Sequence, residues 1–177
     1  MKKVIYFKND DQKNDCCKNQ TYLSFLTYAF EKTNYFMLVY VNYYGKGYTK
    51  IMKRYREALK PFEIKVRTNP SWPGTMSRCS DTTYKVVFYK NNDKAKEILS
   101  SVECMSQWSG PNYPQDLAFF KGNQCWFYSV GHETIAAILY ATEEDVEFVE
   151  KNGLADKSSV LIVEDTYLEE YNEILER

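Results

Sequence analysis

Three apolar runs joined by two tight turns constrain the fold of this chain more than any other feature of its sequence. Leu117–Phe120 and Cys125–Val130 have strand length, and the KGNQ segment between them contains Gly and Asn, which tolerate positive φ. A second turn at Gly131–Glu133 leads into Thr134–Ala141. The spacing predicts a β-meander over residues 117–141.

Hydrophobic patterns predict further elements on both sides of this meander. Tyr35–Val41 is a continuous apolar run typical of a central strand. Tyr48–Leu59 has helical periodicity, and Pro61 ends that helix. The strict alternation of Phe62–Arg67 predicts a strand with one buried and one solvent-exposed face. The other predicted strands are Lys2–Phe7, Tyr84–Tyr89 and Ser158–Val163, and the other predicted helices are Thr21–Lys32, Asn92–Val102, Thr142–Asn152 and one from Asp165 with Leu168, Tyr171, Ile174 and Leu175 on one side.

The length and composition favour one folded domain. The chain has 177 residues, of which 44% are hydrophobic, and it contains no repeat, low-complexity linker or composition break. We therefore expect a single α+β domain over residues 1–177, with a mainly antiparallel sheet of five to seven strands packed on one side by helices. No apolar run approaches the roughly 20 residues of a membrane helix, and no signal-peptide core follows the N-terminus, so we expect a cytoplasmic protein.

The cysteine and histidine content argues against a metal site. The five cysteines form no C-x-x-C pair, and there is one histidine. We expect five reduced, mostly structural thiols and no metal. The chain also lacks the glycine-rich motifs that bind nucleotide phosphates, and no cofactor is expected.

Charge is distributed unevenly along the chain. Residues 142–177 hold twelve acidic and three basic residues, a net charge of −9, whereas residues 1–141 hold twenty basic and twelve acidic residues, a net charge of +8. Such separation can steer a charged partner. It can equally let the acidic C-terminal helices lie on the basic body.

Residues 70–153 resemble a bacterial family of unassigned function. The motifs are WPGT from Trp72, KEIL from Lys96, Trp108, P-x-D-L from Pro114, and CWFYSVGHE from Cys125. They are similar to small proteins often labelled "stage III sporulation protein AH". This chain differs by Gln115, where the family tends to have Glu, and by Gly131, where it tends to have Ala. Members are similar in size and style to the immunity proteins of bacterial toxin systems.

Loop residues are the first candidates for a functional site. Trp72 and Trp108 lie beside Pro and Gly, where we expect semi-exposed rings suited to a protein interface, although rings that cover the core from the side are the alternative. His132 and Glu133 either pin the hairpin through hydrogen bonds, contact a partner, or act as a base and its orienting carboxylate. Adjacent strand residues point to opposite faces, which disfavours the last role unless the turn rotates Glu133 toward His132. Weaker alternatives are a dyad of His132 with a cysteine (Cys125, Cys16, Cys79 or Cys104) and acid pairs among Glu103, Asp116 and Glu133.

The predicted helix at Tyr48–Leu59 is the second candidate. Lys53, Arg54 and Arg56 lie on its polar face among tyrosines. This pattern suits an acidic protein or a nucleic acid, and it also suits a plain solvated face. The sequence pI near 6.0 disfavours a dedicated nucleic-acid binder.

These features together predict a cytoplasmic binding protein without catalysis, most specifically an immunity protein that neutralises a bacterial toxin by covering its site. The candidate contacts are Trp72, Trp108, His132 and Glu133 on the loops, and the acidic C-terminal region would steer a basic partner. Lys53, Arg54 and Arg56 of the basic helix are further candidates. A small enzyme using His132 with Glu133 or a cysteine is the alternative. A nucleic-acid-associated protein that uses the basic helix is a further one.

Overall fold

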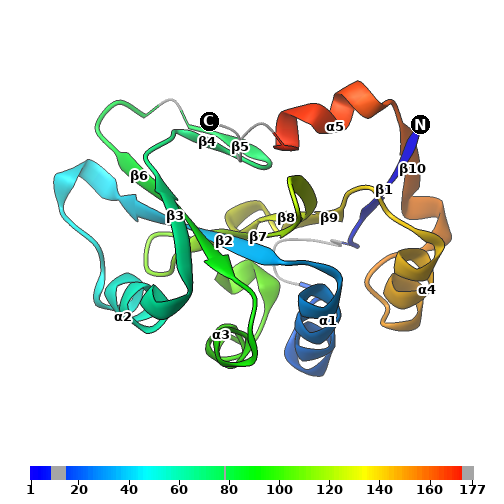
Figure 1. Ribbon diagram of the computed structural model, residues 1–177, viewed down its shortest axis with the longest axis horizontal. Coiled ribbons are helices and arrows are strands. Elements are labelled where there is room, and N and C mark those ends of the chain that lie inside the picture. Colours follow the sequence, from blue (N-terminus) through cyan, green and yellow to red (C-terminus); the bar gives the residue numbers. More distant parts are fainter. Residues whose placement is uncertain (9–14, 78, 173–177) are drawn as a thin grey trace.

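An eight-stranded antiparallel sheet forms the centre of the computed structural model, which describes residues 1–8, 15–77 and 79–172 (Figure 1). The strand order is β10-β1-β9-β8-β7-β2-β6-β3. The strands are β1 (Lys2–Tyr6), β2 (Tyr35–Asn42), β3 (Glu63–Arg67), β6 (Thr83–Lys90), β7 (Gln115–Lys121), β8 (Gln124–Val130), β9 (Ile135–Ile138) and β10 (Val160–Val163). The predicted α+β class and antiparallel sheet are confirmed. The predicted five to seven strands are wrong, because all eight apolar segments with a strand pattern join the same sheet.

The predicted meander forms the middle of this sheet. Strands β7, β8 and β9 are hydrogen-bonded neighbours, with Phe119 opposite Phe127 and Tyr128 opposite Ala137. Strand β9 is shorter than predicted and ends at Ile138. Tyr140, two residues later, has a φ of 54°, which no extended strand can accommodate.

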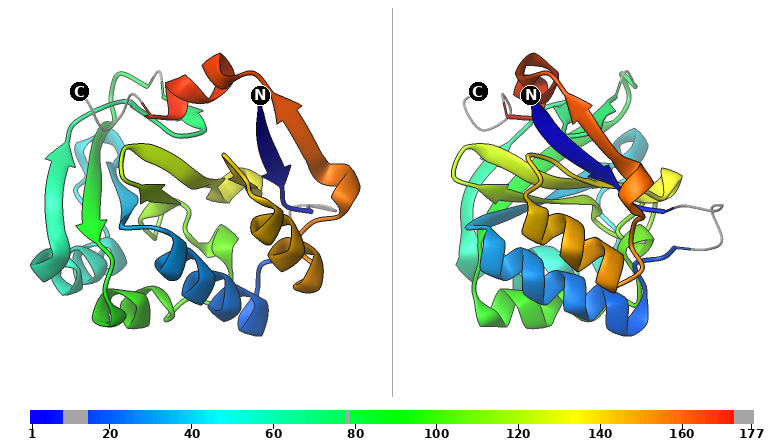
Figure 2. Two further views of the ribbon diagram at one scale, coloured as in Figure 1. Left: turned by 45° about the vertical axis from the view of Figure 1, so that its right-hand side comes forward. Right: turned by 90° about the vertical axis from the view of Figure 1, so that its right-hand side faces the viewer.

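Both faces of the sheet are covered. Helices α1 (Asn19–Lys32), α2 (Lys50–Ala58), α3 (Asp93–Leu99) and α4 (Glu143–Lys151) pack on one face. The other face carries α5 (Asp165–Asn172) and the small hairpin of β4 (Ser71–Trp72) and β5 (Thr75–Met76), as Figures 1 and 2 show. The expectation of helices on one side only is therefore wrong.

The side chains of β2 and β6 explain why two layers are needed. Tyr40 on β2 and Tyr89 on β6 belong to the core under helices α1 to α4, whereas Met37 and Phe88 on the same strands face α5 and the hairpin. All four are at most 2% exposed. A sheet that is apolar on both faces is stable only when each face is covered.

Strand β3 departs from its sequence pattern. Strict alternation predicts a buried apolar face, yet Ile64 is 52% and Val66 is 39% exposed, while Arg67 is buried. The strand lies at the end of the sheet, and its pairing with β6 contains a register shift between Glu63 and Lys65. Since an edge strand has a neighbour on one side only, its outward apolar side chains lack covering residues.

Several helix ends match their sequence signals. Thr142 and Asp145 form the reciprocal capping box of α4, and Asn92 caps α3 by accepting from the Ala95 amide at 2.9 Å. Leu168 and Tyr171, predicted to share one side of the terminal helix, are both buried in α5, whereas Ile174 and Leu175 lie outside the described residues. None of the described helices is long and apolar enough to cross a membrane.

Candidate binding surface

A groove of about 340 Å³ lies between α2 and the sheet. Its floor is apolar and aromatic, and its rim is mostly basic. The floor residues are Tyr40, Tyr48 and Met52, and the rim residues are Lys53, Arg56, Glu57, Lys60 and Lys85. The rings of Tyr40 and Tyr48 meet edge to face, with centroids 6.4 Å apart. A volume of this size accommodates a few side chains of a partner or a small ligand.

Helix α2 holds the groove in place. Thr49 caps it by accepting from the Met52 amide at 3.1 Å. The side facing the sheet is anchored by Tyr55, whose hydroxyl lies 2.6 Å from Ser101 Oγ and whose ring packs edge-on against Trp108 at 5.1 Å. The opposite, polar side of the helix therefore has a fixed orientation toward solvent.

Arg56 is committed to contacts inside the protein. Its guanidinium forms an ion pair with Glu63 and lies 5.6 Å from the Tyr40 ring centroid. Burial alone would raise the pKa of Glu63, but the hydrogen bonds from Arg56 and Lys60 outweigh burial and lower this pKa. Behind this pair, burial raises the pKa of Tyr89 to about 12, and its hydroxyl donates to Tyr40 at 2.9 Å. The sequence predicted Arg56 on an open basic face, whereas the structure places it in the wall of the groove.

Lys53 and Lys85 differ from Lys60, the other exposed lysine of the rim, which forms an ion pair with Glu63. Both are exposed, and within the described part of the chain neither forms an ion pair with an acidic side chain. Lys85 Nζ lies 5.8 Å from the Tyr48 ring centroid. Arg54 is also exposed and lies over the Tyr55 ring at 5.7 Å, outside the groove lining. Of the three basic helix residues selected from the sequence, Lys53 remains the best placed for a partner.

Two groove residues were missed by the sequence analysis. Tyr40 and Lys85 lie on β2 and β6, far from α2 in sequence, and face each other across the two strands. Their place in the groove depends on which strands lie under the helix, which periodicity does not specify. Lys85 did give a local signal, since a lysine inside the apolar run of β6 indicates an exposed position on one face.

Trp72 is buried, which contradicts the expected semi-exposed ring. It is 3% exposed, and its indole Nε1 donates to Asp116 Oδ2 at 2.7 Å. The same carboxylate accepts from the Gly131 amide at 3.0 Å and from Thr75 Oγ1 at 3.4 Å. Burial raises the pKa of Asp116, while the hydrogen bonds from Trp72 and Gly131 act in the opposite direction. Trp72 thus fastens the β4–β5 hairpin to the sheet.

Trp108 is also buried, with no exposed surface, so its expected semi-exposed position is wrong as well. Its Nε1 donates to the Tyr22 hydroxyl at 2.9 Å, and that hydroxyl donates to the Leu99 carbonyl at 2.8 Å. The ring is wedged between Tyr55 and Tyr113. Trp72 and Trp108 can both be buried because each indole N–H donates to an acceptor inside the protein.

Close backbone approaches explain two glycines of this region. A Cβ on Gly131 would lie 2.1 Å from the Trp108 carbonyl oxygen. A Cβ on Gly74 would lie 2.6 Å from the Tyr128 ring. Residue 131 is one of the positions where this chain differs from the family that it resembles, and the contact with Trp108 leaves room only for glycine.

His132 and Glu133 lie together on the surface. Their side chains are 59% and 54% exposed, and His132 Nε2 lies 3.5 Å from Glu133 Oε1. They belong to a 3₁₀ turn, Gly131–Glu133, so the alternation of a strand does not separate them. The turn therefore rotates the two side chains to the same side, which is the exception that a turn allows, and the pair is available to solvent on an open surface.

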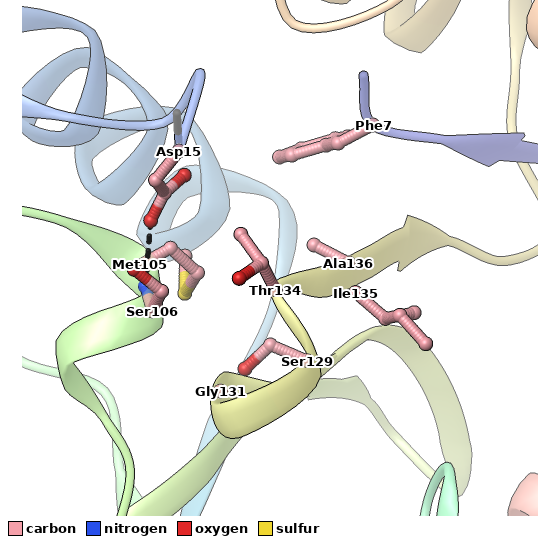
Figure 3. A pocket seen from close by; sticks show the side chains of 9 residues that line it. All are labelled: Phe7, Asp15, Met105, Ser106, Ser129, Gly131, Thr134, Ile135 and Ala136. Atoms are coloured by element: carbon pink, nitrogen blue, oxygen red, sulfur yellow. Dashed lines mark hydrogen bonds between the residues drawn. The ribbon is translucent and has the colours of Figure 1, made fainter. Parts of the chain in front are cut away.

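The cavity nearest this turn is too small for a substrate. Figure 3 shows its lining, in which Asp15 accepts from the Ser106 amide at 2.7 Å. Gly131 and Thr134 contribute to the lining, but His132 and Glu133 do not. Its volume of about 10 Å³ is close to that of a single water molecule.

Two of the cysteines are deeply buried. Burial raises the pKa of Cys125 and of Cys17 well above the usual thiol value. The Cys125 thiol donates to the Phe127 carbonyl at 3.4 Å. Since the thiolate is the nucleophilic form, these two residues have the character of structural thiols. Among the described residues, no group of three or more His, Cys, Asp or Glu side chains is arranged to hold a metal ion.

The acidic C-terminal region lies against basic groups near the N-terminus. Ion pairs join Lys3 to Glu143, Lys32 to Glu144, Lys8 to Asp156 and the amino group of Met1 to Asp165. Each pair is exposed or partly exposed, so its individual contribution to stability is small. Together they support the interpretation in which the acidic region packs on the basic body.

Comparisons with protein families, curated proteins and solved structures found no match to this chain. The resemblance of residues 70–153 to the sporulation-labelled family therefore remains an expectation from the motifs. What the structure adds is that the motif residues Trp72, Asp116 and Gly131 meet through hydrogen bonds in the folded chain.

Proposed function

We propose that this chain is a non-catalytic binding protein whose partner is a protein with an acidic surface. The observation that carries the proposal is the groove beside α2, where the partly buried ring of Tyr48 lies next to the exposed cations Lys53 and Lys85. Apolar and aromatic surface supplies affinity in protein interfaces, and charges at the rim select the partner and accelerate its association.

The loop that leads into α2 carries an exposed aromatic residue. Tyr44 is 65% exposed and has a φ of 54°, an uncommon backbone conformation for a bulky residue. Strained, exposed aromatic residues of this kind occur at binding sites more often than in ordinary loops. Tyr44 is therefore proposed as a further contact.

Within this class, the role proposed is that of a cytoplasmic immunity protein that neutralises a bacterial toxin by covering its site. The support is the similarity in size and style to immunity proteins and a binding surface held by a helix and two strands. A surface with a fixed shape loses little conformational entropy on binding, which suits tight occlusion. The buried Trp72 and Trp108 are no longer among the proposed contacts.

The test uses the product of the neighbouring open reading frame as the proposed toxin. We expect wild-type protein to protect cells that produce this product and to bind it in solution. Lys53→Glu combined with Lys85→Glu should weaken binding by about tenfold or more, because the two rim lysines that form no ion pair with a described acidic side chain are reversed. Binding is measured by isothermal titration calorimetry, and protection is measured by growth.

A matched control variant separates local from global charge effects. Lys94→Glu combined with Lys151→Glu changes the net charge equally at exposed positions on α3 and α4. It should bind and protect like the wild type. If it weakens binding as much as the groove variant, the groove is not the contact surface.

Substitution of His132 tests the catalytic alternative. His132→Ala should protect as well as the wild type if the function is occlusion. Full loss of protection in His132→Ala, with full protection by the groove variant, would instead support an enzyme that uses the His132–Glu133 pair. Binding of RNA or DNA that weakens steeply with salt would favour the nucleic-acid alternative.

A further inference from the structure

Trp126 differs from the other two tryptophans in the use of its indole N–H group. The indoles of Trp72 and Trp108 donate to acceptors inside the protein, at 2.7 Å and 2.9 Å. Trp126 is also buried, with 5% of its surface exposed, but its Nε1 forms no hydrogen bond with a described residue. That nitrogen is not completely enclosed. A nearly buried side chain therefore keeps one accessible donor without an acceptor.

A β-bulge gives the Trp126 ring its position. Phe119 of β7 is opposite Phe127 of β8, and Phe120 is opposite Cys125, so Trp126 is the extra residue of the bulge. Trp126 and Phe127 both pack in the core under α1 to α4, although the regular alternation of a strand would send them to opposite faces. Bulges re-aim side chains in this way, and they are frequent beside binding sites.

The Trp126 ring lines a pocket of about 470 Å³, so its accessible nitrogen opens into that pocket. One wall comes from the turn between β7 and β8, with Lys121 and Gln124, and the other comes from the first turn of α4, with Glu143, Glu144 and Asp145. Figure 2 shows α1 and α4 side by side on this face of the sheet. The pocket shares no lining residue with the groove beside α2.

The acidic groups of the pocket are already engaged within the protein. Asp145 is 1% exposed and accepts hydrogen bonds from the hydroxyls of Tyr28 and Thr142, both at 2.8 Å. The two glutamates form ion pairs with lysines outside α4, namely Lys3–Glu143 and Lys32–Glu144. The α4 wall therefore has little remaining need for a cation.

The opposite wall has donors that are still open. Lys121 is exposed and forms no ion pair with an acidic side chain of the described chain segments. The exposed Gln124 amide forms no hydrogen bond with a described residue. Together with Trp126 Nε1, this wall offers three donors, one of them charged. The group that satisfies them is an acceptor that carries a negative charge.

We infer that this pocket binds a small organic carboxylate. Its two oxygens accept from Trp126 Nε1 and from Lys121, and the rest of the molecule occupies the remaining volume, which is in the range of small-molecule sites. A phosphate fits less well, because its second negative charge would face the three acidic side chains of α4. This site lies apart from the groove and does not depend on the proposed function.

The test follows the indole N–H resonances of the full chain by proton–nitrogen correlation NMR. Trp126→Phe keeps an aromatic ring in the core and identifies the Trp126 resonance by its loss. Without ligand, the Trp126 N–H should exchange with solvent faster than those of Trp72 and Trp108, because it has no acceptor inside the protein.

Two carboxylates, N-acetylglycine and phenylacetate, serve as the probes at concentrations up to tens of millimolar. At least one should shift the Trp126 resonance to saturation and leave the other two indoles in place. Its primary amide, which has the same skeleton without the charge, should bind at least about fivefold more weakly. Inorganic phosphate should also bind more weakly than the carboxylate.

A charge variant with a matched control assigns the binding to the pocket. Lys121→Gln should weaken carboxylate binding by about fivefold or more, measured by calorimetry, because it removes the charged donor. Lys94→Gln, an equal change at an exposed position of α3, should bind like the wild type. Both positions are exposed, so this comparison remains available if Trp126→Phe does not fold. The groove variant of Lys53 and Lys85 should also bind the carboxylate normally, which separates this site from the proposed function.

Four results would overturn the inference. They are a Trp126 N–H as protected from exchange as the other two, no saturable shift with either carboxylate, an amide or phosphate that binds as tightly as the carboxylate, and unchanged binding in Lys121→Gln. Circular dichroism establishes that each variant is folded.

Discussion

Replacement of Asp116 by alanine is expected to lower the free energy of unfolding by about 3–5 kcal/mol. The carboxylate is 1% exposed and accepts hydrogen bonds from Trp72 Nε1 and the Gly131 amide, so its removal leaves two buried donors without an acceptor. Residue 116 also has a φ of 60°, which aspartate tolerates better than alanine. Urea denaturation followed by tryptophan fluorescence measures the loss.

Asp116→Asn is the matched control for this prediction. Asparagine tolerates the same backbone conformation and keeps one acceptor oxygen. Its NH₂ group replaces the second carboxylate oxygen and therefore sets a donor against one of the two buried donors. We expect a loss of about 1–3 kcal/mol, smaller than that of the alanine variant. Equal stability of the alanine variant and the wild type would show that Asp116 does not fasten the hairpin to the sheet.

Replacement of Trp108 by alanine is expected to cost about 3–5 kcal/mol, because it removes one of the largest fully buried side chains and leaves a cavity. The ring packs edge-on against Tyr55 of α2, so the cavity opens directly behind the helix that forms the groove. Partner binding should therefore weaken together with stability. Thermal unfolding and calorimetric titration measure the two effects.

Trp108→Phe distinguishes packing from hydrogen bonding. Phenylalanine keeps an aromatic ring between Tyr55 and Tyr113 but loses the N–H that donates to the Tyr22 hydroxyl. The Tyr22 hydroxyl still donates to the Leu99 carbonyl, so we expect a loss of only about 1–2 kcal/mol. A phenylalanine variant as unstable as the alanine variant would assign the main role to the indole N–H.

The two predictions assign a structural role to the motifs that first suggested a functional site. The segments that contain Trp72, Asp116 and Gly131 lie far apart in sequence, and their hydrogen bonds join a hairpin, a strand and a turn. These residues stabilise the fold. The surface proposed for binding lies instead around Lys53, on a helix that the motifs do not include.

The role of the acidic C-terminal region could not be decided from the sequence. A net charge of −9 over residues 142–177 was compatible with steering a partner and with packing on the basic body. The ion pairs of Lys3, Lys32 and the N-terminal amine with acidic residues of this region support packing. Since β1 pairs with β10, the N-terminal bases and the C-terminal acids are neighbours through topology alone.

The sequence by itself determined most of the elements of this protein, because strands, helices and caps depend on residues that are close along the chain. The meander at β7–β9, the capping box of Thr142 and the helix α2 all follow from such local patterns. Only the tertiary structure decided which side chains are exposed. Burial of Trp72 and Trp108 depends on distant acceptors, exposure of Ile64 depends on the place of β3 at the sheet edge, and the groove exists because β2 and β6 lie under α2.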